Sequence, residues 1–216
     1  PLMRSFARRW LAGILIAGAS IGAAHARQGA LPYSLAHRAV QAVDVPLVTV
    51  PGVDATAMRA QVDARKHPIG PQAKRLLVAT GEAVSITPRN DGAWQVLADG
   101  SGLWRIRIRA PGATDLRFSF ARYPLPPDAR LYVIGADDAY QGQYTADDAV
   151  AGRFNTPVIP GDAAMLELHV AADTNWNPDA LELARVGVGF RDAFHREDGE
   201  PGYPGSAGAC NIDVVC

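Results

Sequence analysis

Two thiols are the most reactive groups in this sequence, and both lie in its last seven residues. Along an extended chain, the Cα atoms of Cys210 and Cys216 would lie roughly 20 Å apart, whereas a disulfide joins Cα atoms about 4.4–6.8 Å apart. Ile212, Val214 and Val215 are β-branched and favour extended backbone, so pairing of the two thiols with each other is the lesser alternative. We expect partners beyond Cys216, which would make this sequence the leading part of a longer precursor.

Serine and histidine give no recognisable catalytic motif. The stretch Pro204-Gly205-Ser206-Ala207-Gly208 resembles a nucleophile elbow, but it lacks the first glycine and has no strand and helix around it. A triad of Ser206 with His169 is therefore disfavoured. The five histidines show no metal-ligand spacing, and two cysteines separated by five residues do not make a zinc site. We expect no catalytic residue, no metal and no cofactor in this chain.

Two pairs of aspartates, Asp137-Asp138 and Asp147-Asp148, are the other candidate ligands. Their carboxylates could bind calcium. Aspartates beside glycine and alanine are more often turn formers, because their side chains bond to nearby backbone groups. His169 stands in an apolar stretch, and we expect it to face solvent or a polar partner.

Residues 3–26 have the pattern of a secretory signal peptide. A basic start is followed by the uncharged apolar run Trp10–Ala23, and Ala24-His25-Ala26 supplies the small residues of a cleavage site. The run is shorter than the ~20 apolar residues that span a bilayer. We expect cleavage after Ala26 and secretion into an oxidising compartment where disulfides form.

The charge of the sequence excludes some classes of binding partner. The formal net charge is -1 and the isoelectric point is near 6.6, so no basic footprint for nucleic acid or an anionic membrane is present. We expect no nucleic-acid partner, and no membrane partner once the signal is removed. Arginine greatly outnumbers lysine, which occurs only at Lys66 and Lys74.

The segment 27–72 is predicted to be an extended lead-in with one short helix. Prolines punctuate its first half, which should drape over the following domain. Asp54 is a good N-cap residue, and apolar residues at near-helical spacing follow it up to His67. Pro68 should end this helix.

The segment 73–194 is predicted to be an antiparallel β-sandwich. From Trp104 to Arg109 apolar residues alternate strictly with arginines, which places Trp104, Ile106 and Ile108 on a buried face. Similar short stretches are separated by Gly, Pro and Asp turns, which is typical of an all-β sandwich. Further strands are expected around residues 76–86, 94–96, 116–122, 131–134, 165–170 and 183–190.

Residues 195–209 are predicted to be an exposed linker. They are rich in glycine, proline and acidic residues and cannot form a core. Exposed linkers are preferred sites of proteolysis.

The terminal motif now supports a resemblance to a family. Gly208–Cys216, with its Cys-Asn-Ile-Asp-Val-Val-Cys stretch, resembles the start of the mature enzyme in the secreted bacterial lysyl endopeptidases, which are trypsin-like serine proteases. Four upstream stretches resemble the propeptide of that family: Trp104–Ala113, Leu116–Pro126, Leu131–Ile134 and Thr156–Asp162.

The resemblance implies a precursor of signal peptide, propeptide and a protease domain of two β-barrels that begins within residues 210–216. The propeptide would assist folding and inhibit the enzyme, so its partners would be its own protease domain and, for the enzyme, protein substrates. Cys210 and Cys216 would bond to separate cysteines of the protease. The catalytic triad would lie beyond Cys216.

One departure concerns specificity for lysine. Arg196 is the only basic residue other than histidine between Phe194 and Cys210, so a self-maturing lysine-specific enzyme has no lysine near its junction. Either this relative cuts after arginine, with Arg196 as the processing site, or another enzyme matures it.

A non-catalytic binding module is the competing interpretation. A secreted sandwich could hold sugar rings or a protein on exposed aromatic side chains. The candidates are Trp94, Trp104, Tyr123, Tyr132 and Tyr140. The alternation around Trp104 favours packing in the core for that residue.

Overall fold

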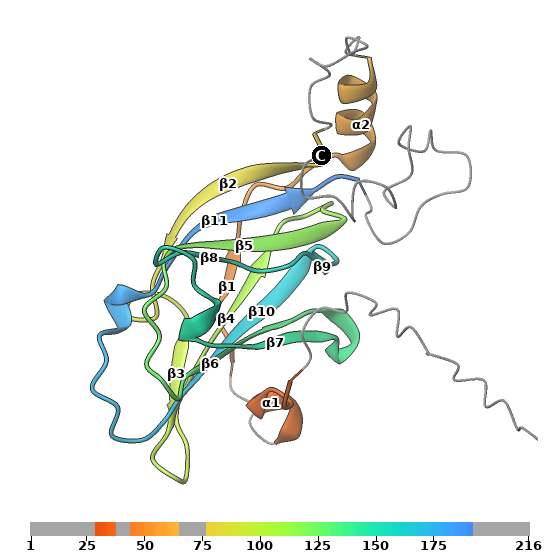
Figure 1. Ribbon diagram of the computed structural model, residues 1–216. Coiled ribbons are helices and arrows are strands. Elements are labelled where there is room, and N and C mark those ends of the chain that lie inside the picture. The colour runs from red at the N-terminus through yellow and green to blue at the C-terminus, as the bar shows by residue number, and fades with distance from the viewer. Residues whose placement is uncertain (1–28, 38–43, 65–76, 192–216) are drawn as a thin grey trace, which may run out of the picture.

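Alternation of apolar and polar residues along the strands builds two β-sheets that face each other (Figure 1). The computed structural model describes residues 29–37, 44–64 and 77–191. The first sheet has the order β1-β4-β10-β6-β7, with β3 beside β4, and the second has the order β2-β11-β5-β8, with β9 beside β5. The expected all-β sandwich is confirmed.

The strands of the first sheet are β1 (Leu47–Thr49), β3 (Ala93–Val96), β4 (Gly102–Arg109), β6 (Arg130–Ile134), β7 (Tyr140–Tyr144) and β10 (Ala163–Val170). The strands of the second sheet are β2 (Ala79–Ile86), β5 (Asp115–Arg122), β8 (Phe154–Asn155), β9 (Ile159–Pro160) and β11 (Glu182–Gly189). Neighbouring strands are antiparallel, except that β1 runs parallel to β4. Among the described residues, three short 3-10 turns lie between strands: η2 (Ala136–Asp138), η3 (Ala146–Asp148) and η4 (Pro178–Ala180).

The core lies between the two sheets and follows the predicted period of two. Trp104, Ile106 and Ile108 on β4 are buried, as the alternation with arginine required. On β5 of the facing sheet, Leu116 and Phe118 are fully buried as well. Side chains from both inner faces thus form one apolar cluster.

The predicted helix is present as α2 (Ala55–Asp63). The Asp54 side chain caps it by accepting a hydrogen bond from the backbone N–H of Ala57 at 2.9 Å. Val62 is its buried anchor. The positions that would have extended the helix to His67 lie outside the described residues.

Several short elements have no counterpart in the sequence pattern. In the lead-in, β1 pairs with β4, and the N–H of Val50 continues this pairing to the carbonyl of Arg109 at 2.9 Å. The four-residue helix α1 (Tyr33–Ala36), β7, β8 and β9 were also not foreseen. Elements of two to five residues are too short to show a clear period, so their pairing depends on the rest of the fold.

The expected domain boundaries, at residues 26, 72 and 194, lie outside the described ranges and stay predictions. Among the described residues, no helix is long and apolar enough to cross a membrane.

Replacement of a central core residue should test the packing of the two sheets. Leu166 is fully buried on β10, between β4 and β6, so Leu166→Ala should lower the free energy of unfolding by about 2–5 kcal/mol. The matched control, Val96→Ala, removes a side chain that is 79% exposed and should change stability by less than about 0.5 kcal/mol. Urea denaturation followed by tryptophan fluorescence measures both, and equal losses would contradict this account of the core.

Candidate functional site

Two opposite charges, Arg105 and Glu167, are buried side by side on the outer face of the first sheet. Arg105 of β4 stands directly opposite Glu167 of β10, and the two residues are 2% and 0% exposed. The guanidinium of Arg105 donates to the side-chain oxygen of Gln95 on β3 at 3.1 Å. The backbone N–H of Ser34 in α1 lies 3.3 Å from both carboxylate oxygens of Glu167. The pair therefore joins three strands to the short helix above them.

The lead-in covers this face because several bonds hold it down. The N–H of Gly29 bonds to the carbonyl of Gly142 on β7 at 2.6 Å. Arg107 holds the other end of the lead-in: its N–H bonds to the carbonyl of Pro46 at 2.8 Å and its Nε to that of Val45 at 3.0 Å. Arg105, which the alternation places on the outer face with the other arginines of β4, is buried as a result.

Burial shifts the titration of groups in this network. Burial lowers the pKa of Arg105, and the neighbouring carboxylate of Glu167 opposes that shift. Burial also raises the pKa of Tyr132 on β6, and the charge of Glu167 adds to this shift. Tyr132 therefore stays a neutral phenol near neutral pH, and its hydroxyl donates to Gln143 at 3.4 Å.

His169, Ser101 and Asp99 form a second chain of hydrogen bonds, with the residue types of a serine protease triad in a different order. The Ser101 hydroxyl donates to the Asp99 carboxylate at 2.6 Å, and Nε2 of His169 lies 3.0 Å from the same hydroxyl oxygen. Because that hydroxyl hydrogen points to Asp99, the imidazole donates and cannot act as the base for serine. Ser101 is also 2% exposed, so its hydroxyl is not accessible to a substrate. We interpret these hydrogen bonds as positioning β10.

The expectation that His169 meets a polar partner is confirmed by its bond to Ser101. Its ring also stacks on that of Tyr33 in α1, with centroids 5.7 Å apart and planes 5° apart. The His37 ring stacks with Tyr33 too, at 4.1 Å. These rings form a second attachment of α1 to the sheet.

An open cavity of about 860 Å³ lies on the same side of the sandwich. Val45, Leu47, Ile134 and Met165 give it apolar walls, and Arg107 and Arg109 give it charge.

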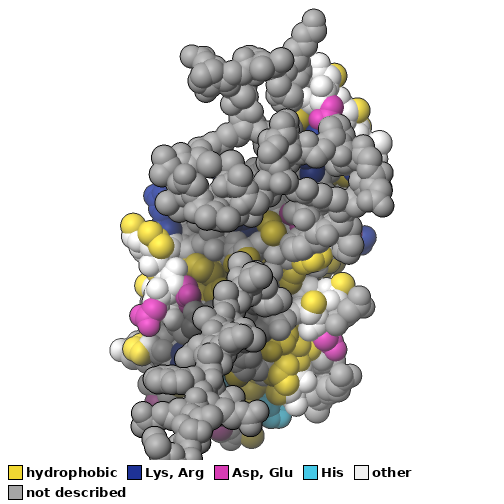
Figure 2. All heavy atoms as spheres, turned by 45° about the vertical axis from the view of Figure 1, so that its right-hand side comes forward, with side chains coloured by type: hydrophobic (Ala, Val, Ile, Leu, Met, Phe, Trp, Pro, Cys, Tyr) yellow, Lys and Arg dark blue, Asp and Glu magenta, His cyan; other side chains and the backbone are white. Residues whose placement is uncertain are grey.

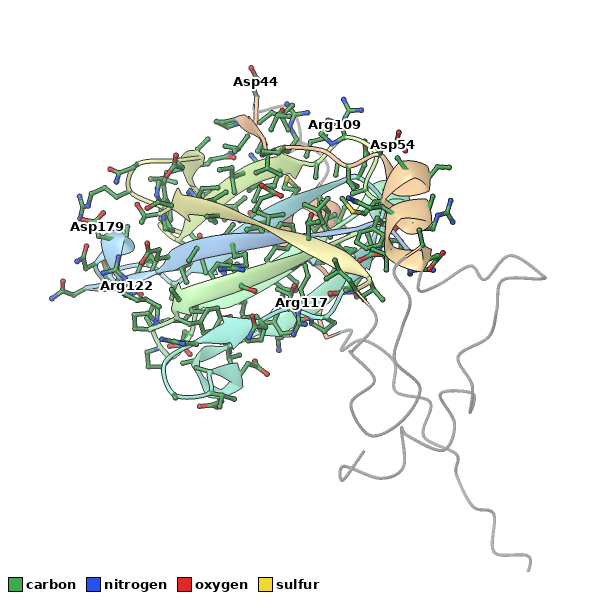
Figure 3. All side chains as sticks on the ribbon, turned by 90° about the horizontal axis from the view of Figure 1, so that it is seen from above. Asp44, Asp54, Arg109, Arg117, Arg122 and Asp179 are labelled. Carbon is green, nitrogen blue, oxygen red and sulfur yellow. The ribbon has the colours of Figure 1, made fainter. Side chains whose placement is uncertain are left out.

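The charges around this cavity are already paired. Arg109 forms an ion pair with Asp162 at 3.1 Å, and a guanidinium nitrogen of Arg107 lies 4.0 Å from Asp44. Figure 3 shows Arg109 and Asp44 on one side of the sandwich and Arg117 toward the other. The described walls of the cavity hold carboxylates and guanidinium groups but no Ser, Thr, Cys, Lys or His side chain.

The paired aspartates are turn formers where their side chains are described. Asp148 accepts hydrogen bonds from the Thr145 N–H at 2.7 Å and from its hydroxyl at 3.3 Å, closing a capping box at η3. Asp138 lies in η2 with a positive φ of 60°. Within the described part of the chain, no three His, Cys, Asp or Glu residues are grouped to hold a metal.

The aromatic residues of the binding-module interpretation do not form an exposed platform. Trp104, Tyr123 and Tyr132 are buried. Trp94 is 42% exposed, but its indole N–H is bonded to the carbonyl of Pro88 at 2.6 Å. Tyr140 donates its hydroxyl to Gly29, so it also helps to hold the lead-in.

On the face drawn in Figure 2, basic side chains stand apart from one another, and acidic side chains lie singly. No continuous basic patch gathers on the part of that face that is described. This agrees with the near-zero net charge of the sequence.

The remaining predicted site residues, Ala26, Arg196, Cys210 and Cys216, lie outside the described residues and stay predictions, and so does the disfavoured Ser206. Sequence reasoning missed the buried pair of charges, Arg105 and Glu167, and the Asp99–Ser101 bond. One signal could have found the pair: Glu167 interrupts the apolar stretch Met165–Val170, where a lone carboxylate needs a buried cation.

Comparison with known proteins assigns this domain. Residues 49–187 match the family described as lysyl endopeptidase N-terminal domain. The chain belongs to this family.

A curated relative in Pseudomonas aeruginosa, named lysyl endopeptidase, is 29% identical over 177 residues. The matched region is 78% of this chain and 38% of that protein, so the chain spans well under half of the relative. No solved structure matches the chain. The expected resemblance to lysyl endopeptidases is therefore confirmed.

Removal of one member of the buried pair should be costly. Glu167→Ala removes the carboxylate that stands opposite the buried Arg105 charge, so we expect a loss of about 3–5 kcal/mol of unfolding free energy. The double variant Glu167→Leu with Arg105→Met replaces both charges by apolar groups and should recover most of that loss. Thermal and urea unfolding measure both. A double variant as unstable as the single one would contradict the role of charge compensation.

Ser101 should control the titration of Asp99. Its hydroxyl and its N–H bond to the Asp99 carboxylate and hold the pKa of that group below its ordinary value of 3.8. A carboxylate whose pKa is lowered by folding stabilises the fold at pH values above its unfolded pKa of about 3.9. This contribution is lost as the pH falls through the pKa of the folded state. Ser101→Ala should raise the pKa of Asp99, as measured by carboxyl-carbon NMR titration. An unchanged Asp99 titration in Ser101→Ala would contradict the assignment, and Ser119→Ala is the control.

Proposed function

We propose that this chain is the N-terminal part of the precursor of a secreted serine endopeptidase that cleaves after basic residues. In this proposal the sandwich is a propeptide that assists the folding of the protease and inhibits it until export. The observation that carries the proposal is the family match over residues 49–187, together with a relative named as an endopeptidase of which the chain spans 38%.

The architecture of the described domain suits a partner role. Its buried polar groups fasten strands and the lead-in to one another, as Glu167 does for α1 and Ser101 for β10. A protease with many non-local contacts would fold slowly. A rigid sandwich attached to it could offer a preformed surface on which those contacts assemble.

Resistance to cleavage supports lysine as the preferred residue. An inhibitor that stays beside a protease has to survive it. The whole chain holds only two lysines, Lys66 and Lys74, against 19 arginines, so a lysine-specific enzyme would find few sites in it. Arg89, by contrast, is exposed in the turn after β2, where an arginine-specific enzyme would find it. On this argument the protease is lysine-specific, and another enzyme cuts the linker near Arg196.

Export and disulfide formation complete the proposal. Residues 3–26 would direct secretion, with cleavage after Ala26. Cys210 and Cys216 would then pair with cysteines of the protease in the oxidising compartment. The linker 195–209 would separate the two folded parts.

Deletion of the sandwich should test this function. In the longer gene that carries the protease, removal of residues 29–191 should lower the yield of active enzyme about tenfold or more, because slow non-local folding then proceeds unaided. Leu166→Ala should lower the yield partly, and the exposed control Val96→Ala should leave it unchanged.

The second measurement adds the separately produced N-terminal part to mature protease and follows hydrolysis of a lysine ester. We expect inhibition that the control variant retains. Equal yields with and without the sandwich, together with no inhibition in trans, would overturn the proposal.

A further inference from the structure

Four edges bound the two sheets, and three of them are protected against pairing with another strand. Natural sheets protect their edges with short strands, prolines, charges or a covering segment. In the first sheet, β1 and β3 form an edge of strands three and four residues long. The opposite edge, β7, is bonded to the lead-in through Gly142 and Gly29. In the second sheet, β8 and β9 are two residues each, and β9 ends in Pro160.

The fourth edge, β2, lacks most of these devices. It is eight residues long, Ala79–Ile86, and contains no proline and no basic residue; Glu82 is its one charge. Within the described residues it pairs with β11 alone, along the rim of its sheet in Figure 1. Leu77 and Val78, just before it, are 45% and 44% exposed. This edge is therefore long, regular and partly apolar.

The backbone of β2 has bonding positions along this edge that no other described strand uses. The carbonyl of Val78 accepts from the N–H of Phe190 at 3.0 Å, so Val78 faces the β11 side. In an antiparallel pair the bonding direction alternates from residue to residue. Ala79, Gly81 and Ala83 consequently direct their N–H and C=O groups away from β11.

Side chains leave this backbone accessible. Gly81, Ala83 and Ser85 are exposed and small. On β11, the exposed Arg185 lies across Gly81, with its Cδ 3.0 Å from where a Cβ would be. A strand arriving at this edge would meet open backbone groups and one cation.

We propose that β2 accepts, by strand addition, an extended strand of the polypeptide that follows this domain in the precursor. This rests on the proposed function and names the surface through which the propeptide holds its protease. Strand addition takes its affinity from main-chain hydrogen bonds, which an open edge supplies. An acidic side chain on the incoming strand would pair with Arg185.

The exit point of the chain identifies this occupant. Gly189, the last residue of β11, pairs with Ala79, the first residue of β2. The polypeptide beyond Arg191 therefore leaves the sandwich at one end of the open edge. The chain spans 38% of its curated relative, so a large part of such a precursor would be tethered there. Tethering raises the local concentration of a strand and favours its pairing over that of a free partner.

A proline at Ala83 tests the edge. Its N–H points away from β11, so Ala83→Pro removes a donor from the incoming strand while the bonds to β11 remain. The matched control is Val96→Pro on β3. The bond from the Leu97 N–H to the Ser101 carbonyl shows that the neighbouring Val96 N–H also points away from its partner strand.

Both variants are made in the full-length precursor and checked by circular dichroism and thermal unfolding. After maturation, size-exclusion chromatography with light scattering measures the fraction of N-terminal domain that stays with the protease. We expect Ala83→Pro to lower this fraction about tenfold, as the loss of one or two main-chain bonds requires, and Val96→Pro to leave it unchanged.

Hydrogen exchange of the wild-type precursor gives a readout that needs no variant. The amides of residues 79–86 should exchange more slowly in the precursor than in the released domain, while those of β11 stay the same. Equal exchange of residues 79–86 in both forms would overturn the inference even where Ala83→Pro does not fold.

The possible results distinguish the proposed strand addition at β2 from the proposed propeptide function. If the wild-type and Ala83→Pro domains stay bound to the protease and inhibit it equally, the strand addition at β2 is overturned and the propeptide role is retained. A wild-type domain that neither stays bound nor inhibits would overturn both. A homodimer of the domain that Ala83→Pro abolishes would assign the edge to a second copy and overturn the tethered strand as its occupant.

Discussion

The carboxylate of Glu167 constrains the rest of this domain more than any other group. It lies on a central strand with no exposed surface, so its charge requires a cation and hydrogen-bond donors at that place. Arg105, opposite it on β4, supplies the cation, and Ser34 supplies a backbone donor from α1. The lead-in is therefore part of the folded unit: without α1 above them, the buried charges of Arg105 and Glu167 would face water.

That constraint makes the two outer faces of the sandwich unequal. The outer face of the first sheet is covered by the lead-in, and Tyr33 and Pro46 are fixed on it by contacts with β10 and β4. On the outer face of the second sheet, exposed residues are mostly small, and Arg117 lies across Gly187 there. A partner that needs backbone contact thus finds it on the second sheet, where the open strand β2 also lies.

The sequence predicts the elements that show a clear hydrophobic period, and it misses the contacts between residues that are distant along the chain. Eight-residue strands such as β4 and β10 carry enough alternation to reveal the sandwich, and Asp54 marks the helix start by its chemistry. The parallel pairing of β1 with β4 cannot be seen in three residues between prolines. The burial of Arg105 is equally hidden, because it follows from a helix about seventy residues earlier in the sequence. Ser101 was missed because its partner His169 is distant along the chain.

The choice of arginine over lysine serves two constraints at once. Arg107, Arg117 and Arg122 each bond to a main-chain carbonyl that no strand satisfies, those of Val45, Thr156 and Asp179. A planar guanidinium, with five donors in a fixed fork, can hold such a carbonyl while its other nitrogens meet a carboxylate, as Arg122 does with Glu182. A lysine ammonium, a compact point charge on a flexible stem, would fix these loops less well. Under the proposed function the same arginines would also escape a lysine-specific protease. The structural need for guanidinium groups and the proposed survival of the domain beside its enzyme would then favour the same composition.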